Sequence, residues 1–393
     1  MDYRFADRVK MFKSSAIREI SEIIAKGNDV ISFAGGFPYE PYFPQAELEQ
    51  AFDKVFASGK SSLQYGMTSG FMPLREKISE RVKAKGIQAA PVEVLLTTGS
   101  QQSIDLFSRI MLSPGDVVLT ENPTFLAAVQ AFESYEAKVI GVQSDKDGMD
   151  PEDLAKKLKE YKPKFIYVVP TFSNPEGKVW SNERRVALLK LAEEHNTLIL
   201  EDDPYGELQF NAEETYTPIA AMDTEKKYVI YTSSFSKTVV PSLRVGWVTG
   251  PQPIMKVLAQ IKEAADLMSS PLNQQALYHL LNDFDLDGHI RMLCQQYHQH
   301  MLVMQDYLKK LDSCKWVEPK GGMFIWLEVD ENIHATELLT KVVPHGVAFI
   351  PGAPFYVDSP RQNTMRLNFT NSNPERIKLG MERLTEAFQQ AMK

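Results

Sequence analysis

A single lysine stands in a serine-rich stretch of the sequence between two apolar segments. Residues 233–237 read Ser-Ser-Phe-Ser-Lys, Arg244 follows seven positions after Lys237, and no other charged residue lies between Ser233 and Leu243. Most lysines are solvated surface charges, but a lysine removed from water near an arginine has a lowered pKa and can act as a nucleophile. Serine hydroxyls and an arginine can also bind a dianionic phosphate. Lys237 is therefore a candidate nucleophile beside a candidate phosphate site.

Three further polar motifs each follow an apolar segment. Residues 99–101, Gly-Ser-Gln, precede a helical pattern, so their backbone N–H groups could bind a phosphate, or Ser100 could simply cap the helix. Asn174 lies in a turn sequence, where its amide could cap the loop or donate a hydrogen bond to a ligand. Asp202 and Tyr205, three residues apart, could bind two polar atoms of one flat ligand. Each motif is weak by itself, whereas the set favours one shared site.

Short apolar segments between residues 94 and 249 alternate with helical patterns. The predicted strands are Val94–Thr97, Val117–Thr120, Lys138–Val142, Phe165–Val169, Thr197–Glu201, Tyr228–Thr232 and Val245–Thr249, and the predicted helices include Gln102–Met111, Phe125–Glu133, Pro151–Tyr161 and Asn182–Glu194. Most of these strands are continuous apolar runs, which predicts burial on both faces. The alternation indicates an α/β fold with a mostly parallel sheet between helices. Ligands bind such sheets beyond the carboxyl ends of the strands, where the polar motifs lie.

The two ends of the chain have a different pattern. After Pro251, helix formers dominate residues 252–311, and the remainder mixes strand and helix patterns in the manner of a second, smaller α+β domain. The strand predictions there are Trp316–Val329, Val347–Ile350 and Met365–Phe369, and the helix predictions are Asp287–Lys310, Thr336–Val343 and Pro374–Met392. The first forty residues contain a predicted helix, Ser14–Ala25, followed by a Gly/Pro-rich loop at residues 35–38.

Composition and charge lower the expectation of several other classes of protein. The 393 residues carry a net charge of −8, which disfavours nucleic acid and anionic membranes as partners. Only two cysteines occur, without a CxxC pair, as is typical of a reducing compartment. No apolar run approaches the roughly 18 residues of a membrane span, and the charged N-terminus does not resemble a secretory signal. His298 and His300 fall on different faces of a helix, so no metal site is predicted, and a cytoplasmic location is expected.

In their types and in their order along the chain, the motifs resemble those of the class I/II pyridoxal-phosphate aminotransferases of fold type I. They are most similar to the group containing 2-aminoadipate, kynurenine and aromatic aminotransferases. The resemblance spans nearly the whole chain, from residues 15–20 to residues 365–369. It rests on Gly99-Ser100-Gln101, Ser173-Asn174-Pro175-x-Gly177, Asp202-x-x-Tyr205 and Ser234-Phe235-Ser236-Lys237 with Arg244. It implies a large cofactor domain over residues 41–284, built on a mostly parallel seven-stranded sheet. A small domain would combine residues 285–393 with residues 1–40, which would also form a substrate lid.

The resemblance implies pyridoxal 5′-phosphate as the cofactor and assigns roles to the motifs. Lys237 would attach the cofactor covalently and carry a proton during the reaction. Asp202 would pair with the pyridine nitrogen and favour its protonated form. Asn174 and Tyr205 would hydrogen-bond to the phenolic oxygen of the ring. The phosphate ligands would be Ser100, Gln101, Ser234, Ser236 and Arg244.

Five further positions receive roles through the resemblance. Phe125 would stack on the pyridine ring, although an aromatic residue at a helix start is also a common core residue. Arg366 would clamp the α-carboxylate of the substrate. Gly36 and Arg18 belong to the segment that closes over the substrate, where Arg18 would either bind a distal carboxylate or remain a solvated helix residue. Tyr65 would reach the phosphate site of a neighbouring subunit, which implies a homodimer with shared active sites.

The implied reaction is a ping-pong transfer of an amino group from an L-amino acid to a 2-oxo acid. Candidate donors are 2-aminoadipate, aromatic and aliphatic amino acids, and the expected acceptor is 2-oxoglutarate. A β-lyase or a decarboxylase on the same fold is the main alternative, because these reactions share the same cofactor-binding residues. A regulator with an aminotransferase-like domain is a weaker alternative, since only 17 residues precede Arg18 and a DNA-binding domain needs about sixty.

Overall fold

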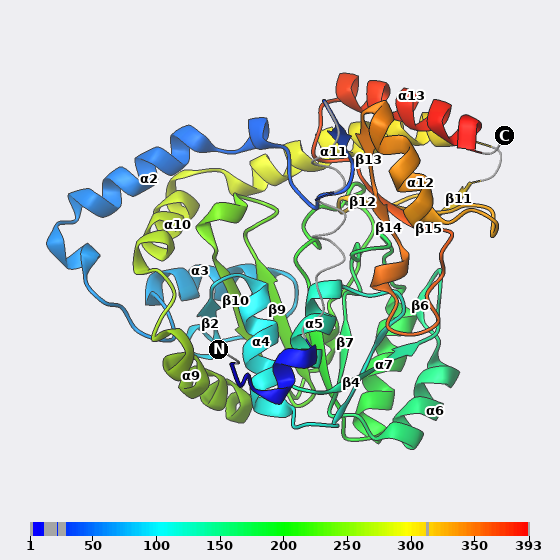
Figure 1. The fold of residues 1–393 in the computed structure, drawn as a ribbon. Coiled ribbons are helices and arrows are strands. Elements are labelled where there is room, and N and C mark those ends of the chain that lie inside the picture. The colour runs from blue at the N-terminus through cyan, green and yellow to red at the C-terminus, as the bar shows by residue number, and fades with distance from the viewer. Residues whose placement is uncertain (1–2, 12–21, 23–28, 312–313, 392–393) are drawn as a thin grey trace.

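The computed structural model describes residues 3–11, 22, 29–311 and 314–391. Most of the predicted helix Ser14–Ala25, including Arg18, lies outside these described residues. Figure 1 shows a large sheet-centred part, with a smaller part beside one end of the sheet that carries α11 (Leu286–Leu308), α12 (Ala335–Val342) and α13 (Pro374–Ala391). Within the described residues, no helix combines the length and the apolar character needed to cross a membrane.

A seven-stranded sheet forms the centre of the large part, as predicted. Its order is β2-β10-β9-β8-β7-β3-β4, and only β10 runs antiparallel to its neighbours. The strands are β2 (Leu95–Thr97), β3 (Val117–Glu121), β4 (Lys138–Val142), β7 (Phe165–Val168), β8 (Leu198–Asp202), β9 (Val229–Ser234) and β10 (Gly246–Thr249). Each corresponds to one of the predicted apolar segments. The prediction of a mostly parallel α/β sheet is therefore confirmed.

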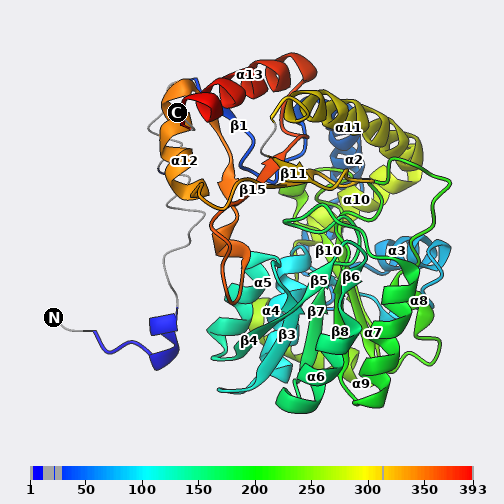
Figure 2. The same ribbon diagram turned by 90° about the vertical axis from the view of Figure 1, so that its right-hand side faces the viewer.

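Helices cover both faces of this sheet because the strands are apolar on both sides. Phe165 and Tyr167 of β7 belong to a core that also contains Phe107 and Phe132, from helices on one face. Ile166, between them in the strand, belongs to a different core on the other face. The helices of the large part are α2 (Gln45–Ala57), α3 (Met72–Ala84), α4 (Ser100–Met111), α5 (Leu126–Ser134), α6 (Pro151–Tyr161), α7 (Asn182–Glu194), α8 (Ile219–Met222), α9 (Gln252–Asp266) and α10 (Pro271–Asp283). Figure 2 shows α6 and α7 against the sheet.

The smaller part joins segments from both ends of the chain. Its four-stranded sheet has the order β11-β12-β15-β14, and β1 (Ile31–Ser32) pairs in parallel with β13 (Val347–Ala348). The remaining strands are β11 (Lys315–Trp316), β12 (Phe324–Glu328), β14 (Ile350–Pro351) and β15 (Thr364–Asn368), with a separate hairpin of β5 (Ser144–Asp145) and β6 (Gly148–Met149). The pairing of β1 with β13 agrees with a small domain built from both ends. The exact division at residues 40 and 284 stays a prediction.

Two strand predictions in the smaller part were too long. The predicted strand Trp316–Val329 is two strands, β11 and β12, separated by a loop that contains Gly321 and Gly322. Gly322 has a φ of +74°, a conformation that breaks a strand and that glycine adopts without strain. The predicted strand Val347–Ile350 is likewise divided between β13 and β14, which belong to different sheets.

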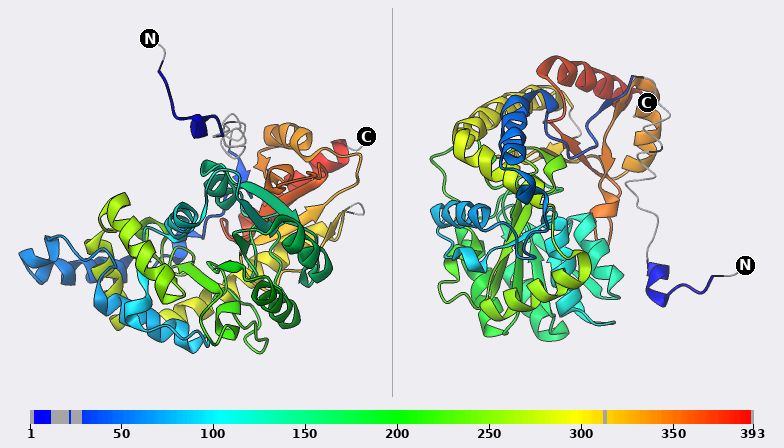
Figure 3. Two further views of the ribbon diagram at one scale, coloured as in Figure 1. Left: turned by 90° about the horizontal axis from the view of Figure 1, so that it is seen from below. Right: turned by 90° about the vertical axis from the view of Figure 1, so that its left-hand side faces the viewer.

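Figure 3 shows α2 and α10 packed together at the edge of the molecule remote from α12 and α13.

Candidate active site

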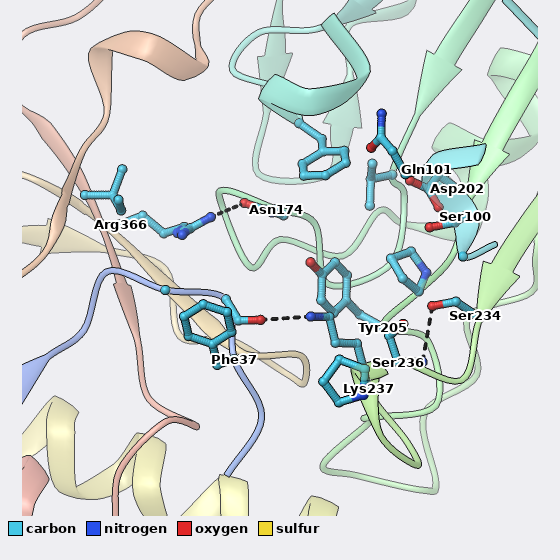
Figure 4. A pocket seen from close by; sticks show the side chains of 18 of the residues that line it. Phe37, Ser100, Gln101, Asn174, Asp202, Tyr205, Ser234, Ser236, Lys237 and Arg366 are labelled. Atoms are coloured by element: carbon cyan, nitrogen blue, oxygen red, sulfur yellow. Dashed lines mark hydrogen bonds between the residues drawn. The ribbon is translucent and has the colours of Figure 1, made fainter. Parts of the chain in front are cut away.

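A cavity of about 550 Å³ lies at the carboxyl ends of the central strands, and the smaller part of the molecule contributes to its walls. Most of the predicted site residues line it: Gly36, Ser100, Gln101, Phe125, Asn174, Asp202, Tyr205, Ser234, Ser236, Lys237, Arg244 and Arg366. In Figure 4, Ser100, Gln101 and Ser234 lie on one side of the cavity, Arg366 lies on the other, and Lys237 and Tyr205 lie between them. The structure therefore brings together motifs that are as much as 330 residues apart in the sequence.

Lys237 follows the end of β9 and extends into this cavity. Its Nζ donates a hydrogen bond to the backbone oxygen of Gly36, at 2.8 Å. Burial lowers the pKa of Lys237 to about 8, and the positive charges of Arg366 and Arg244 contribute to the shift. A lysine with this pKa has a substantial neutral fraction near physiological pH, which a nucleophilic amine requires.

Asp202 is the last residue of β8 and is almost completely buried. Its Oδ2 accepts a hydrogen bond from the hydroxyl of Tyr167, at 2.9 Å, whereas its Oδ1 has no hydrogen-bond partner among the described residues. Burial raises the pKa of Asp202 to about 7; the bond from Tyr167 lowers it, and the neighbouring Asp203 raises it. Because buried polar atoms in native proteins are nearly always paired, this oxygen is suited to accept a hydrogen bond from a ligand, such as a protonated ring nitrogen.

The N-terminus of α4 forms a cradle for an anion. Ser100 begins the helix, and Gly99 before it has a φ of +76°; a Cβ there would lie 2.6 Å from Nη2 of Arg244. The positive φ favours glycine here, and any side chain would also displace the guanidinium of Arg244. Arg244 donates to the backbone oxygen of Thr98 at 3.2 Å, which places its guanidinium beside the helix N-terminus. Free backbone N–H groups, an arginine and the hydroxyls of Ser234 and Ser236 suit a phosphate dianion.

Arg366, on β15, lies on the opposite side of the cavity and is buried. It donates to the side-chain oxygen of Asn174 and to the backbone oxygen of Ala34, each at 2.6 Å. Its carbon Cζ lies 4.3 Å from the ring centroid of Phe324, and burial lowers the pKa of Arg366 to about 10. Among the described residues it has no carboxylate partner within 4.0 Å. A buried guanidinium without a counter-ion is suited to bind a carboxylate from a ligand.

Tyr205 lies between these two sides and is buried. Burial raises the pKa of Tyr205 to about 12, although Arg366 and a hydrogen bond with Asn174 act in the opposite direction. Its hydroxyl is therefore protonated at physiological pH and can donate a hydrogen bond. Phe125, the residue immediately before α5, also lines the cavity and is half-buried, so its ring is accessible to a flat ligand. The roles that the resemblance implies for Tyr205 and Phe125 stay predictions.

Of the predicted site residues that the structure describes, Tyr65 does not line this cavity. Tyr65, in the segment that follows η3 (Lys60–Leu63), is 80% exposed and lines a separate groove. This position agrees with a residue that would act outside its own subunit. Arg18 lies outside the described residues, so its two interpretations stay open.

Sequence reasoning missed part of the cavity wall. The unpredicted lining residues are Ser32, Ala34, Gly35, Phe37, Val169, Pro204, Pro241 and Ile350. Phe37 and Ile350 come from regions near opposite ends of the chain, and no local pattern separates them from ordinary core residues. Tyr167, which holds Asp202, was also missed because it occurs inside an apolar strand. Gly35 and Phe37 do flank the predicted Gly36, so the Gly/Pro-rich loop was a usable signal for them.

The comparisons with known proteins agree with this geometry. Residues 29–384 match the family model of the class I and II aminotransferases. The chain belongs to this family. The aromatic-amino-acid aminotransferase 1 of Thermococcus litoralis is 37% identical over 100% of this chain and 96% of that protein, and the 2-aminoadipate transaminase of Thermus thermophilus is 34% identical over 95% and 94%.

A solved structure shows the same similarity over the whole fold. The kynurenine aminotransferase of Pyrococcus horikoshii, in complex with PMP, superposes with a TM-score of 0.92 at 36% identity, covering 99% of this chain and 98% of that one. This aminotransferase is therefore an enzyme of fold type I whose cofactor is pyridoxal 5′-phosphate. Its substrates are an amino acid and a 2-oxo acid.

Proposed function

We propose that this aminotransferase uses Lys237 as its covalent and proton-carrying residue, in a cavity that also holds a cofactor and the carboxylate of the substrate. The observation that carries the proposal is the position of the Lys237 amine. It lies in one cavity with the guanidinium of Arg366 and with Oδ1 of Asp202, which has no hydrogen-bond partner in the described part of the chain. The amine has a lowered pKa, so it can accept and return a proton near neutral pH.

The large part of the molecule would hold the cofactor. Asp202 would accept a hydrogen bond from the protonated ring nitrogen through Oδ1, and Asn174 and Tyr205 would donate to the phenolic oxygen. When bound, pyridoxal 5′-phosphate supplies an electron-withdrawing ring that stabilises negative charge at the α-carbon of the substrate. Phe125 would stack on that ring. The phosphate would be held by Ser100, Gln101, Ser234, Ser236 and Arg244.

Arg366 would bind and orient the amino acid. Its guanidinium would hold the α-carboxylate, which every amino acid carries, while Asn174 keeps the fork in place through their hydrogen bond of 2.6 Å. Lys237 would then remove the proton from the α-carbon of the substrate and deliver it to the cofactor. In the structure Lys237 donates to Gly36, so covalent attachment of the cofactor would have to replace this contact at 2.8 Å.

The donor proposed here is an aromatic or aliphatic amino acid or 2-aminoadipate, and the proposed acceptor is 2-oxoglutarate. The names of the related enzymes and the apolar wall formed by Phe37, Val169 and Ile350 support an apolar side chain. A second carboxylate in the substrate would depend on a cation outside this wall, the role considered for Arg18. A β-lyase or decarboxylase reaction is less well supported, because the relatives compared above are named as transaminases.

We also propose that the active unit is a homodimer with shared sites. Leu63, Tyr65 and Met67 are 58%, 80% and 73% exposed, an unusual run of apolar side chains for a surface facing water. Tyr65 and Met67 line a groove of about 410 Å³, to which Pro271 also contributes. Covering this surface with a second subunit would bury it and bring Tyr65 towards the partner's phosphate site.

The visible spectrum of the holoenzyme tests the proposal. L-Glutamate is added without any acceptor, and both the yellow colour and the release of 2-oxoglutarate are followed. We expect loss of the colour with one 2-oxoglutarate released per site, because the transfer stops after its first half. Retention of the colour with glutamate and with every aromatic or aliphatic donor would contradict the proposed reaction. Release of ammonia or carbon dioxide instead would identify a lyase or a decarboxylase.

A further inference from the structure

The carboxylate assigned to the cofactor has a second buried carboxylate beside it. Asp202 and Asp203 are only 2% and 4% exposed at the end of β8. Successive side chains of a strand point to opposite faces, and accordingly Asp202 lines the active-site cavity while Asp203 lines a separate cavity of about 240 Å³. An ionised Asp203 would be a like charge close to Asp202, which disfavours ionisation of Asp202.

The two carboxylates are held in the same way by the strands on either side. Tyr167 of β7 donates to Oδ2 of Asp202 at 2.9 Å, and Tyr231 of β9 donates to Oδ2 of Asp203 at 2.7 Å. Each tyrosine stands in register with the residue two positions before the carboxylate that it binds. The hydrogen bonds therefore do not distinguish the two acids, and any difference between them must come from neighbouring charges.

A lysine provides that difference. Nζ of Lys85, which caps the C-terminus of α3, lies 3.1 Å from Oδ2 of Asp203. Burial lowers the pKa of Lys85, but the charges of Asp203 and Glu207 outweigh this effect, so its pKa is raised and the lysine stays protonated. Among the described residues, Asp202 has no ion-pair partner within 4.0 Å. Lys85 thus compensates one carboxylate of the pair and leaves the other free for a ligand.

The other charged groups near Asp203 have partners of their own. Arg81 is bonded to Glu207 at 2.7 Å, and Glu207 lies 3.9 Å from Lys85. Arg185 is bonded to backbone oxygens and to a threonine hydroxyl, and Glu201 accepts from the backbone N–H groups of Ile219 and Ala220. Among the described residues, the ion pair with Asp203 is therefore that of Lys85.

We propose that Lys85 is a positioning residue for cofactor binding: it neutralises Asp203 and so keeps Asp202 ionised, ready to hold a protonated ring nitrogen. This inference rests on the role of Asp202 given under Proposed function. Burial is the largest cause of the raised pKa of Asp202, about 7, and the charge of Asp203 adds to it, so a change in the compensation of Asp203 would change the ionisation of Asp202 near neutral pH. Lys85 does not line the active-site cavity and would act through Asp203.

Four variants of the full chain test whether Lys85 acts on Asp202 through Asp203, because the proposal predicts the direction of each effect. They are K85M, D203N, the double variant K85M/D203N, and the charge-preserving K85R. K83M is the matched control, because Lys83 is an exposed lysine two positions away on α3. The first measurement is the dissociation constant of pyridoxal 5′-phosphate, by fluorescence titration of protein stripped of cofactor. The second is the pH midpoint of ring-nitrogen protonation, from the chemical shift of cofactor labelled with ¹⁵N at that nitrogen.

We expect K85M to weaken cofactor binding about tenfold and to lower the pH midpoint of ring-nitrogen protonation by about one unit. Without Lys85, the negative charge of Asp203 would favour the protonated form of Asp202, which can no longer pair with a protonated ring nitrogen. K85R and K83M should match the parent protein. D203N should raise the midpoint, and the double variant should regain most of the lost affinity, because it removes the charge that Lys85 compensates. Restoration by a second substitution is a result that a merely structural lysine would not give.

Losses that add in the double variant, or unchanged values in K85M, would overturn the proposal. If K85M does not fold by circular dichroism, D203N alone decides, because only an upward shift of its midpoint agrees with the coupling. D202N separates this inference from the proposed function. If D202N leaves ring protonation unchanged, the assignment of Asp202 itself is wrong; if D202N abolishes protonation and the other variants do nothing, only the role of Lys85 fails.

Discussion

The active-site cavity has two halves of different origin. The strand-end half consists of side chains at the carboxyl ends of central strands, among them Ser100, Asp202 and Lys237. The terminal half consists of the loop 34–37, Ile350 and Arg366, which come from regions near the two ends of the chain. The strand-end half is fixed by a buried parallel sheet, whereas the terminal half includes Phe37, which is 62% exposed. The difference suggests that the first half determines the chemistry and the second determines which substrate is accepted.

The largest effect should follow from removing the amine of the strand-end half. Lys237→Ala should reduce kcat by about 10³-fold or more, because both covalent attachment and proton transfer are lost. Steady-state turnover with a 2-oxo acid acceptor measures this, and an unchanged thermal melting curve shows that the fold is retained. Lys237→Arg keeps the charge and serves as the control; it should be equally inactive. Near-normal turnover of either variant would remove Lys237 from the centre of the site.

A smaller, uniform effect is expected from the carboxylate site of the terminal half. Arg366→Ala should raise KM about 100-fold for all amino acids alike, because it removes charged hydrogen bonds to a group that they share. The measurement is KM for one aromatic, one aliphatic and one dicarboxylic donor. Arg366→Lys keeps the charge without the forked guanidinium, and its KM should lie between those of the parent protein and Arg366→Ala. A selective loss of dicarboxylic donors would show that Arg366 binds a side chain instead.

The pH dependence of cofactor attachment tests the strand-end half without a substitution. Only the neutral form of Lys237 can form the covalent bond, and its pKa is about 8. In protein stripped of cofactor, the attachment rate should therefore rise about tenfold per pH unit below pH 8 and level off above it. Rapid mixing with pyridoxal 5′-phosphate at a series of pH values measures this rate. A plateau reached only above pH 10 would mean that the lysine has an ordinary pKa.

The smallest effect is expected at the exposed edge of the terminal half. Phe37→Ala should raise KM for aromatic donors about fivefold, the effect of partly uncovering an aromatic ring, and should leave glutamate nearly unchanged. Its exposure predicts a change in the free energy of unfolding of less than about 0.5 kcal/mol. Comparison of the two donors in one preparation gives the result, with Phe37→Leu as the control. Equal effects on both donors would show that Phe37 does not contact the side chain.

The two halves also differ in how far the sequence predicts them. The strand-end residues follow apolar strands, and parallel strands bring their carboxyl ends to one edge, so Asp202, Tyr205 and Lys237 could be assigned to one site from local patterns. The terminal half needs contacts across more than 300 residues, such as the bond from Arg366 to Ala34. Gly36 and Arg366 were predicted only through the resemblance to a family. No local signal pointed to Ile350, Ser32 or the strand boundary at residue 349.

The pairing of β1 with β13 has a consequence for the order in which the enzyme is made on the ribosome. Ile31 stands in register with Val347, and Phe33 is hydrogen-bonded to Ala348 and Asn368. Strand β1 therefore cannot pair until nearly the whole chain has been translated, whereas all strands of the central sheet have been translated by residue 249. A nascent chain would acquire its cofactor cradle well before its substrate wall, and so would complete the Lys237–Gly36 contact among its last steps.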